Sequence, residues 1–222
     1  MAPEKIIVIT YIKYNNFIES IHWKKKFEKL PEVIKEKCNK YVRMQDKHSC
    51  FIGKLLLVDG LMHLGVSNDM LLNDWRIDEY GRPYINKKIN FNISHTEGFV
   101  VCAVSMDTVR LGIDIEKVKP VNIYDFALVL GDKVIDEISI SMYPYELFYK
   151  YWTATESSLK ADGRGFSIDM KNIDINFNSN VAIIEDNIWY ITEVSLDSGF
   201  VCYISASYKN IQLKLHRYID CC

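Results

Sequence analysis

Two acidic residues stand two positions apart in the segment Gly112-Ile113-Asp114-Ile115-Glu116. Isoleucines alternate with them, and this pattern predicts a strand with one apolar and one acidic face, because successive strand side chains point to opposite faces. Asp114 and Glu116 should therefore project together. Two carboxylates this close repel each other unless a cation lies between them, and their hard oxygen atoms suit Mg²⁺. The alternative is an exposed strand edge on which both acids are solvated.

Trp152, Glu156 and Lys160 follow one another at intervals of four residues. This spacing predicts a helix on which the three side chains lie along one stripe, with Glu156 and Lys160 on the same face. Considered alone, the stripe needs only a Glu–Lys helix pair, worth about 0.2–0.5 kcal/mol, and an aromatic core anchor.

A Ser94-His95 pair ends the apolar segment that begins at Phe91. A hydroxyl and an imidazole at the end of a strand can donate hydrogen bonds to an anion, and the alternative is a capping or core histidine. We find no nucleophile elbow and no Ser-His-Asp order around this pair, which argues against serine hydrolysis.

The elements that must position these residues alternate between strands and helices. Apolar and β-branched runs predict strands at about 6–14, 89–94, 99–105 and 109–116, with a polar loop at 95–98 and a turn at 80–83. Helical periodicity predicts one or two helices over 35–64 and another over 145–161, which Pro144 precedes and Gly163 and Gly165 end. Four short strands at about 173–177, 181–184, 189–195 and 200–207 follow. The pattern indicates an α+β fold.

One segment of the chain is echoed later. Gly98-Phe99-Val100-Val101 is followed 101 residues further on by Gly199-Phe200-Val201-Cys202, each after an acidic polar turn. The echo predicts two similar halves, residues 1–110 and 111–222, although Gly-Phe-Val also opens many unrelated hairpin strands. A seam between two halves is a natural place for a ligand cleft.

Composition limits the class of protein. With 222 residues, of which 49% are apolar and 25% charged, the chain can bury a core without a metal or disulfide. Its 27 basic and 29 acidic residues give a net charge of −2, which argues against a general nucleic-acid binder. The run Lys24–Lys26 is interpreted as a solvated surface, with docking of a partner protein as the alternative.

The cysteines and apolar runs predict a cytoplasmic protein. Six cysteines show neither a C-x-x-C pair nor zinc-like spacing, so a reducing compartment is expected. The short apolar run Ile6–Ile12 is interpreted as a first strand rather than a signal peptide, and no run reaches the 18 or so apolar residues of a membrane span.

Taken in order, four motifs resemble the 4'-phosphopantetheinyl transferases of the surfactin-synthetase-activating type. They are Tyr80-Gly81-Arg82-Pro83, Phe91-Asn92-Ile93-Ser94-His95, Gly112-Ile113-Asp114-Ile115-Glu116-Lys117, and Trp152-x-x-x-Glu156-Ser157-x-x-Lys160-x-x-Gly163-x-Gly165. The resemblance implies two α+β halves related by a pseudo-twofold. It also implies a Mg²⁺-dependent enzyme of the holo-acyl-carrier-protein synthase kind, which moves the phosphopantetheine arm of coenzyme A onto a serine of an acyl or peptidyl carrier protein.

The resemblance assigns roles to individual residues. Asp114, Glu116 and Glu156 would hold Mg²⁺ against the coenzyme A pyrophosphate, and Glu156 would accept the serine proton. Lys160 and His95 would contact the phosphates and, with Glu156, form the catalytic set. The remaining nucleotide contacts implied are Lys37, His48, Arg82 and Ser94.

Some positions depart from the family pattern. Thr155 stands where most relatives have a lysine, Ile34 where a lysine is expected, and Ser49-Cys50 where Arg-Thr is expected. A degenerate protein that binds coenzyme A or the carrier without turnover is therefore one alternative, and a Mg²⁺-dependent phosphohydrolase is another. A duplicated chain could complete one cleft by itself, so a monomer is expected.

Overall fold

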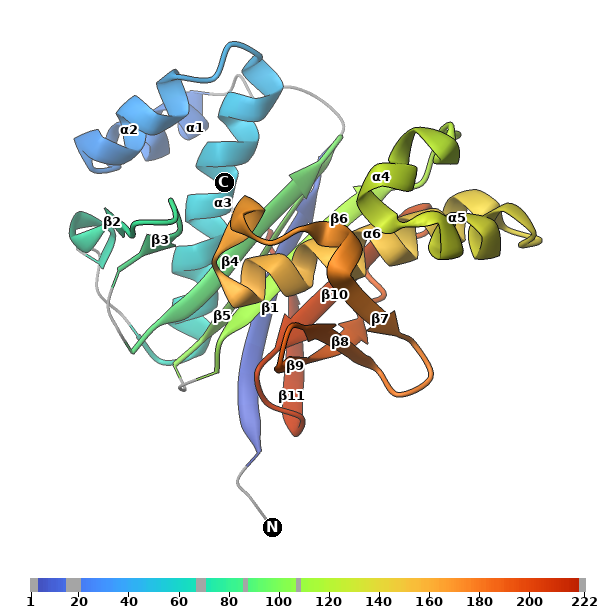
Figure 1. Cartoon of the computed structure of the whole chain (residues 1–222). Coiled ribbons are helices and arrows are strands. Elements are labelled where there is room, and N and C mark those ends of the chain that lie inside the picture. The colour runs from blue at the N-terminus through green and yellow to red at the C-terminus, as the bar shows by residue number, and fades with distance from the viewer. Residues whose placement is uncertain (1–3, 15–20, 67–70, 86–87, 107–108, 220–222) are drawn as a thin grey trace. The chain divides into compact units, whose positions relative to one another are not determined.

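Two groups of strands organise the chain, and a long helix packs on each group (Figure 1). The computed structural model describes residues 4–14, 21–66, 71–85, 88–106 and 109–219. It divides into one unit formed by Met1–Thr108 with Ile211–Cys222 and a second unit formed by Val109–Asn210.

The first unit is built on a sheet with the strand order β11-β1-β5-β4. Strand β1 (Lys5–Lys13) pairs antiparallel with β5 (Phe99–Ser105) and parallel with β11 (Ile211–Arg217), and β5 forms a hairpin with β4 (Asn90–Thr96). Helix α3 (Met44–His63) packs on β1 and β5. The buried Thr10 hydroxyl donates to the Leu56 carbonyl at 2.7 Å, which fixes the helix to the central strands.

Shorter elements cover the rest of this unit. Helices α1 (Ile21–Glu28) and α2 (Glu32–Asn39) precede α3, and the 3₁₀ turn η1 (Leu71–Asp74) leads into a two-stranded ribbon of β2 (Arg76–Ile77) and β3 (Pro83–Tyr84). The core of the unit joins the inner faces of α2 and α3 to β4 and β5, with Ile34, Leu56, Leu61 and Val104 at 0% exposure.

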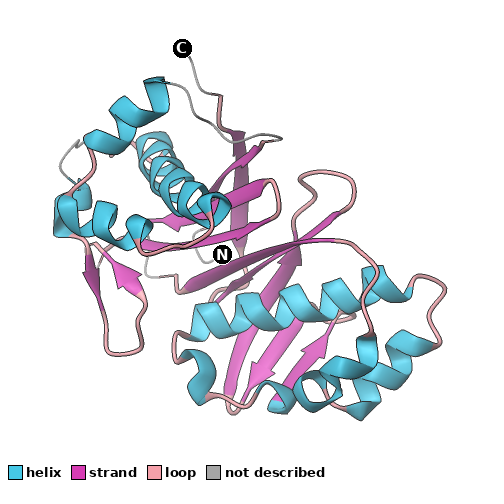
Figure 2. Ribbon diagram, turned by 90° about the horizontal axis from the view of Figure 1, so that it is seen from above, coloured by secondary structure: helices cyan, strands magenta, loops and turns pink. Residues whose placement is uncertain are grey.

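The second unit is built on a five-stranded sheet with the order β6-β10-β9-β8-β7. Its strands are β6 (Leu111–Lys117), β7 (Ile173–Asn176), β8 (Val181–Ile184), β9 (Asn187–Glu193) and β10 (Phe200–Ala206). Helix α6 (Pro144–Asp162) packs along β6 and β10, and Figure 2 shows a long helix lying against the sheet. The other helical segments are η2 (Ile123–Phe126), α4 (Ala127–Leu130), α5 (Asp132–Ser139), η3 (Gly165–Ser167) and η4 (Met170–Asn172).

The two units repeat one topology, as the sequence echo predicts. In the first, β1 is followed by α3 and the β4–β5 hairpin, and β5 inserts beside β1; in the second, β6 is followed by α6 and the β9–β10 hairpin, and β10 inserts beside β6. Both inserted strands follow a glycine with positive φ, 73° at Gly98 and 78° at Gly199, where a side chain would be strained. The α+β fold with two similar halves is thereby confirmed, and the pseudo-twofold between the halves stays a prediction.

The last strand departs from the predicted division at residues 110 and 111. The segment 211–222 was expected in the second half, but β11 pairs with β1 from Lys5↔Ile211 to Tyr11↔Arg217 and so belongs to the first unit. The partner of β11 lies about two hundred residues earlier in the chain, and no local sequence pattern predicts pairing between such distant segments.

Two boundaries also differ from expectation. The one or two helices predicted over 35–64 are α2 and α3, and α2 begins earlier than expected, at Glu32. The predicted loop 95–98 is shorter, because β4 continues through His95 and Thr96, which pair with Val100 and Phe99. His95 is therefore a strand residue and not a loop residue.

The described cysteines Cys38, Cys50, Cys102 and Cys202 are free thiols and buried; Cys221 and Cys222 lie outside the described residues. Among the helices of the described residues, none is both long enough and apolar enough to cross a membrane.

Candidate active site

Strand β6 places the two predicted acids next to helix α6. The alternation holds: Ile113 and Ile115 are fully buried, and Asp114 and Glu116 share the other face. Asp114 is only 4% exposed, however, and Glu116 is half-buried. The alternative of solvated acids on a free strand edge is therefore wrong for Asp114.

Gly112 permits the close approach of β6 and α6. A Cβ atom at this position would meet the backbone of α6 at the Ser157 carbonyl oxygen and the Ala161 nitrogen, neither of which can move aside alone. Only glycine fits such a contact between backbones. The motif Gly112-Ile113-Asp114-Ile115-Glu116 contains this glycine, and a glycine near the start of a strand is the local signal of such a close approach.

A second packing contact between α6 and the sheet is polar. The hydroxyls of Ser157 and Ser158 lie 2.8 Å and 2.9 Å from the hydroxyl of Ser205 on β10, and all three residues are fully buried. Glu156 directly precedes these serines, so the contact fixes the helix turn that carries it. Sequence reasoning missed Ser205, because nothing local links it to a helix 47 residues earlier.

Lys160 is the positively charged residue among three acids, Asp114, Glu116 and Glu156, which we call the acidic group. Its Nζ donates to Asp114 Oδ1 at 2.6 Å and approaches the Ile113 carbonyl at 3.5 Å. Burial lowers the pKa of Lys160, but the negative charges of Asp114, Glu156 and Glu116 outweigh burial and hold that pKa above its ordinary value. The helix pair with Glu156 was the alternative reading of this stripe; the short ion pair of Lys160 is formed with the strand residue Asp114.

Glu156 lies near both a negative side chain, Asp114, and a positive one, Lys160. Burial raises its pKa, the neighbouring charge of Asp114 raises it further, and Lys160 opposes the shift without cancelling it. A carboxylate whose pKa is raised accepts a proton more readily than an ordinary glutamate does. The structure thus brings together four of the predicted residues: Asp114, Glu116, Glu156 and Lys160.

The donor set of this group suits Mg²⁺ in its chemistry. Within the part of the chain that the structure describes, no group of three or more His, Cys, Asp or Glu side chains is arranged to hold a metal ion. Magnesium commonly takes only one or two protein carboxylates and completes its shell with water and substrate phosphate oxygens. Asp114, Glu116 and Glu156 offer such oxygens, so they fit the ion by type.

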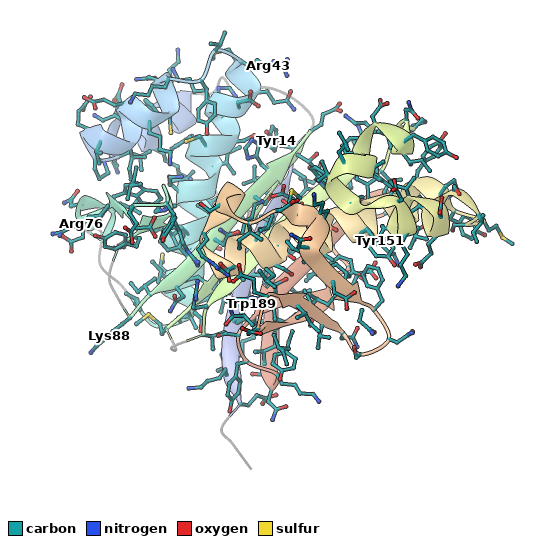
Figure 3. The ribbon with its side chains drawn as sticks, viewed as in Figure 1. Tyr14, Arg43, Arg76, Lys88, Tyr151 and Trp189 are labelled. Carbon is teal, nitrogen blue, oxygen red and sulfur yellow. The ribbon has the colours of Figure 1, made fainter. Side chains whose placement is uncertain are left out.

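Two further residues of α6 have clear positions. Trp152 is partly buried against the core and packs on Phe126 and Phe148, at ring-centroid distances of 5.3 Å and 6.1 Å, which agrees with the alternative of an aromatic anchor. Thr155 is 2% exposed and lines a cavity of about 440 Å³ with Tyr151 and other residues of α5, α6 and β7. Tyr151, labelled in Figure 3, donates its hydroxyl to Glu137 at 2.9 Å in that wall.

The five remaining predicted residues lie in the first unit. Lys37 stands on α2, with its Nζ 6.0 Å from the ring centroid of Trp75, and His48 stands in the second turn of α3. Ser94 is buried on β4, beside the half-buried His95. Arg82 lies in the turn before β3, where its backbone N–H donates to Asp78 Oδ1 at 2.8 Å.

Two protein-family models match this chain over most of its length. The model described as "4'-phosphopantetheinyl transferase superfamily" matches residues 110–203, and the model described as "4'-phosphopantetheinyl transferase, N-terminal" matches residues 19–107. The chain belongs to the 4'-phosphopantetheinyl transferase superfamily. The matched regions run from β6 into the first half of β10 in the second unit and cover most of the helices and strands of the first.

Individual relatives agree with the family. The 4'-phosphopantetheinyl transferase gsp of Aneurinibacillus migulanus is 28% identical over 184 residues, which are 78% of this chain and 74% of that protein. A 4'-phosphopantetheinyl transferase of Bacillus subtilis is 30% identical over 157 residues, 66% of each chain. The transferase Sfp of Bacillus subtilis strain 168 is 26% identical over 193 residues, 79% of this chain and 81% of that protein. The resemblance to transferases of this type is thereby confirmed.

Proposed function

We propose that this protein transfers the 4'-phosphopantetheine arm of coenzyme A to a serine of an apo acyl or peptidyl carrier protein, with Mg²⁺. The family implies coenzyme A as substrate. The observation that carries the proposal is the short Lys160–Asp114 pair beside the charges of Glu116 and Glu156, because this group combines a phosphate-binding cation with oxygen ligands and a base.

In the proposed reaction, the serine hydroxyl attacks the pantetheine-linked phosphorus of the pyrophosphate, and the bond to the adenosine bisphosphate breaks. The serine proton passes to the carboxylate of Glu156, whose raised pKa suits it to that role. The ammonium of Lys160, and His95 of the first unit, would neutralise charge on the phosphate oxygens as it develops. A bound Mg²⁺ would supply further neutralisation, held by Asp114, Glu116 and Glu156.

The remaining site residues are proposed to hold the nucleotide. Arg82 would lie near the adenosine 3'-phosphate or the adenine, and Ser94 would lie with His95 near the phosphates. Lys37 and His48, on α2 and α3, would contact the nucleotide as well. We further propose that the protein is a monomer in the cytoplasm and that it catalyses the holo-acyl-carrier-protein synthase reaction.

Intact-mass spectrometry tests this function. A panel of apo carrier proteins is incubated with the protein, coenzyme A and Mg²⁺, and transfer should add one phosphopantetheine arm to at least one carrier. A parallel reaction without carrier detects adenosine bisphosphate release. Release without carrier would indicate a Mg²⁺-dependent phosphohydrolase, and binding of coenzyme A or carrier without product would indicate a non-catalytic relative.

A further inference from the structure

Two cysteines from different helices lie side by side in the first unit. Cys38 is near the end of α2 and Cys50 is in α3, and they are 0% and 7% exposed. The Cys38 thiol donates a hydrogen bond to Cys50, with the two sulfur atoms 2.9 Å apart. Because sulfur atoms in a disulfide are about 2 Å apart, an approach of less than ~1 Å would bring these two to bonding distance.

A buried lysine adjoins the pair. Lys54 lies one helix turn after Cys50, is 5% exposed, and places its Nζ 4.7 Å from the ring centroid of Trp75. A buried ammonium needs compensation by an anion or by the electron-rich face of an aromatic ring. The charge of Lys54 acts on both cysteines, and Lys37 adds a second positive charge from α2.

The surroundings shift the pKa values of the two thiols in opposite directions. The hydrogen bond from Cys38, supported by Lys54 and Lys37, lowers the pKa of Cys50 below that of an ordinary thiol despite burial. The same hydrogen bond, together with burial, raises the pKa of Cys38, which therefore keeps its proton. Cys102 offers a contrast within the same unit, because burial raises its pKa.

We propose that Cys38 and Cys50 form a peroxide-reactive thiol pair, in which Cys50 is the attacking thiolate and Cys38 is the resolving thiol. The oxidant is a hydroperoxide. The pair is thus a modification site, and its sulfur chemistry is different from the phosphopantetheine transfer proposed for this protein.

Oxidation of the thiol pair takes place in two steps. The Cys50 thiolate attacks one peroxide oxygen, the O–O bond breaks, and a sulfenic acid and a hydroxide form. The Cys38 sulfur then attacks the Cys50 sulfur, an S–S bond forms, and the sulfenic oxygen leaves as water with the Cys38 proton. Two thiols lose two electrons to one peroxide, and a dithiol reductant reverses the change.

The test uses the full chain with Cys221 and Cys222 replaced by serine in every sample, so that only the four described cysteines can react. The folded protein is treated with hydrogen peroxide, quenched in acid, blocked with N-ethylmaleimide, digested and examined by mass spectrometry. We expect a disulfide joining the peptides that contain Cys38 and Cys50, while Cys102 and Cys202 stay alkylatable. Dithiothreitol should restore both thiols.

Three variants make the test more specific. Cys50→Ser should abolish the disulfide and leave Cys38 as a thiol, whereas Cys102→Ser should leave disulfide formation unchanged. Lys54→Met keeps the apolar stem and removes the charge. In an assay at about pH 5, below the Cys50 pKa of about 6, a rise of about one pKa unit lowers the thiolate fraction and should slow oxidation by roughly three- to tenfold. Melting curves establish that each variant is folded.

Three results would overturn the proposal. The first is a folded protein in which Cys38 and Cys50 both remain thiols after peroxide treatment. The second is oxidation of Cys50 no faster than that of Cys102, and the third is a folded Lys54→Met variant that reacts as fast as the parent. The readout is the mass of the protein itself, so its outcome is independent of the proposed transfer reaction.

Discussion

The ammonium of Lys160 lies 2.6 Å from Asp114 Oδ1, and this pair joins helix α6 to strand β6 across 46 residues of sequence. The Lys160 side chain is 28% exposed and the Asp114 side chain only 6%. The attraction within such a pair contributes little net free energy, because both charges lose solvent. Removing one partner is costly, because the other charge is left unpaired and poorly solvated.

Removing either partner should therefore destabilise the second unit. We expect Asp114→Asn to lower the free energy of unfolding by about 1–3 kcal/mol, less than for a fully buried pair because Lys160 keeps some solvent. Lys160→Met should cost at least as much, since it strands the more buried charge. Urea unfolding measures both.

The exposed pair Lys171–Asp169 supplies the matched control. Its side chains are 55% and 49% exposed, so Lys171→Met should change the free energy of unfolding by less than about 0.5 kcal/mol. If Asp114→Asn is as stable as Lys171→Met, the Lys160–Asp114 pair does not stabilise the second unit as expected.

The free energy of unfolding at alkaline pH should depend on Lys160. Its pKa is raised in the folded state, so its contribution is fully present below the unfolded lysine pKa of about 10.4 and is lost as the pH rises through the higher folded value. The difference in unfolding free energy between the parent and Lys160→Met should therefore shrink as the pH rises above about 10. A difference that stays constant through that range would indicate that the folded pKa is not raised.

Glu156→Gln should separate activity from stability. If Glu156 accepts the serine proton, its loss should slow single-turnover transfer by about 10²–10⁴-fold at saturating coenzyme A and Mg²⁺. Stability should not fall at neutral pH. A raised folded pKa means that Glu156 stabilises the fold below its unfolded pKa of about 4.3 and that this contribution disappears as the pH rises to the folded value.

A melting curve recorded beside the kinetics separates these two effects. A Gln variant that melts at or above the parent temperature but transfers slowly supports a catalytic Glu156. One that transfers within a factor of about three of the parent would remove Glu156 from the catalytic set, because the loss of base assistance is expected to exceed that factor widely.

Gly112→Ala tests the close approach of β6 and α6. The added Cβ would meet helix backbone at Ser157 and Ala161, so we expect a loss of about 3 kcal/mol or more, at the upper end for overpacked cores. Gly53→Ala is the comparison, because its Cβ would meet the Cγ2 methyl of Ile93, a side-chain atom rather than helix backbone, so we expect a smaller loss there. Thermal unfolding compares the two, and equal losses would argue against a backbone contact at Gly112.

The nucleotide contacts of the first unit are tested by binding. His95→Ala and Arg82→Ala each remove a hydrogen-bond donor proposed to face a phosphate, and such bonds to charged groups are worth roughly 1.5–3 kcal/mol, or about ten- to a hundredfold in KM for coenzyme A. Stability should change little on replacing Arg82, which is half-buried in a turn whose other residues are exposed. Wild-type KM values in both variants would refute the proposed contacts, whatever the acidic group contributes.

Much of the secondary structure, and the acidic motif, were determined by local sequence. Strand β8 matches its prediction residue for residue, and β5 and α6 differ from theirs by at most one residue at either end, because alternation and helical spacing are properties of neighbouring residues. The same alternation places Asp114 and Glu116 on one face of β6. The repeated Gly-Phe-Val opening correctly predicts two halves with one topology.

Tertiary structure alone decided which of these elements meet. Strand β11 was missed because its partner β1 lies at the other end of the chain. The ion pair of Lys160 with Asp114 joins a helix to a strand and does not follow from helix spacing. The pairing of Cys38 with Cys50 likewise depends on how α2 packs against α3. Periodicity fixes the face on which a side chain lies, but the partner across that face depends on packing between distant segments, which no local pattern encodes.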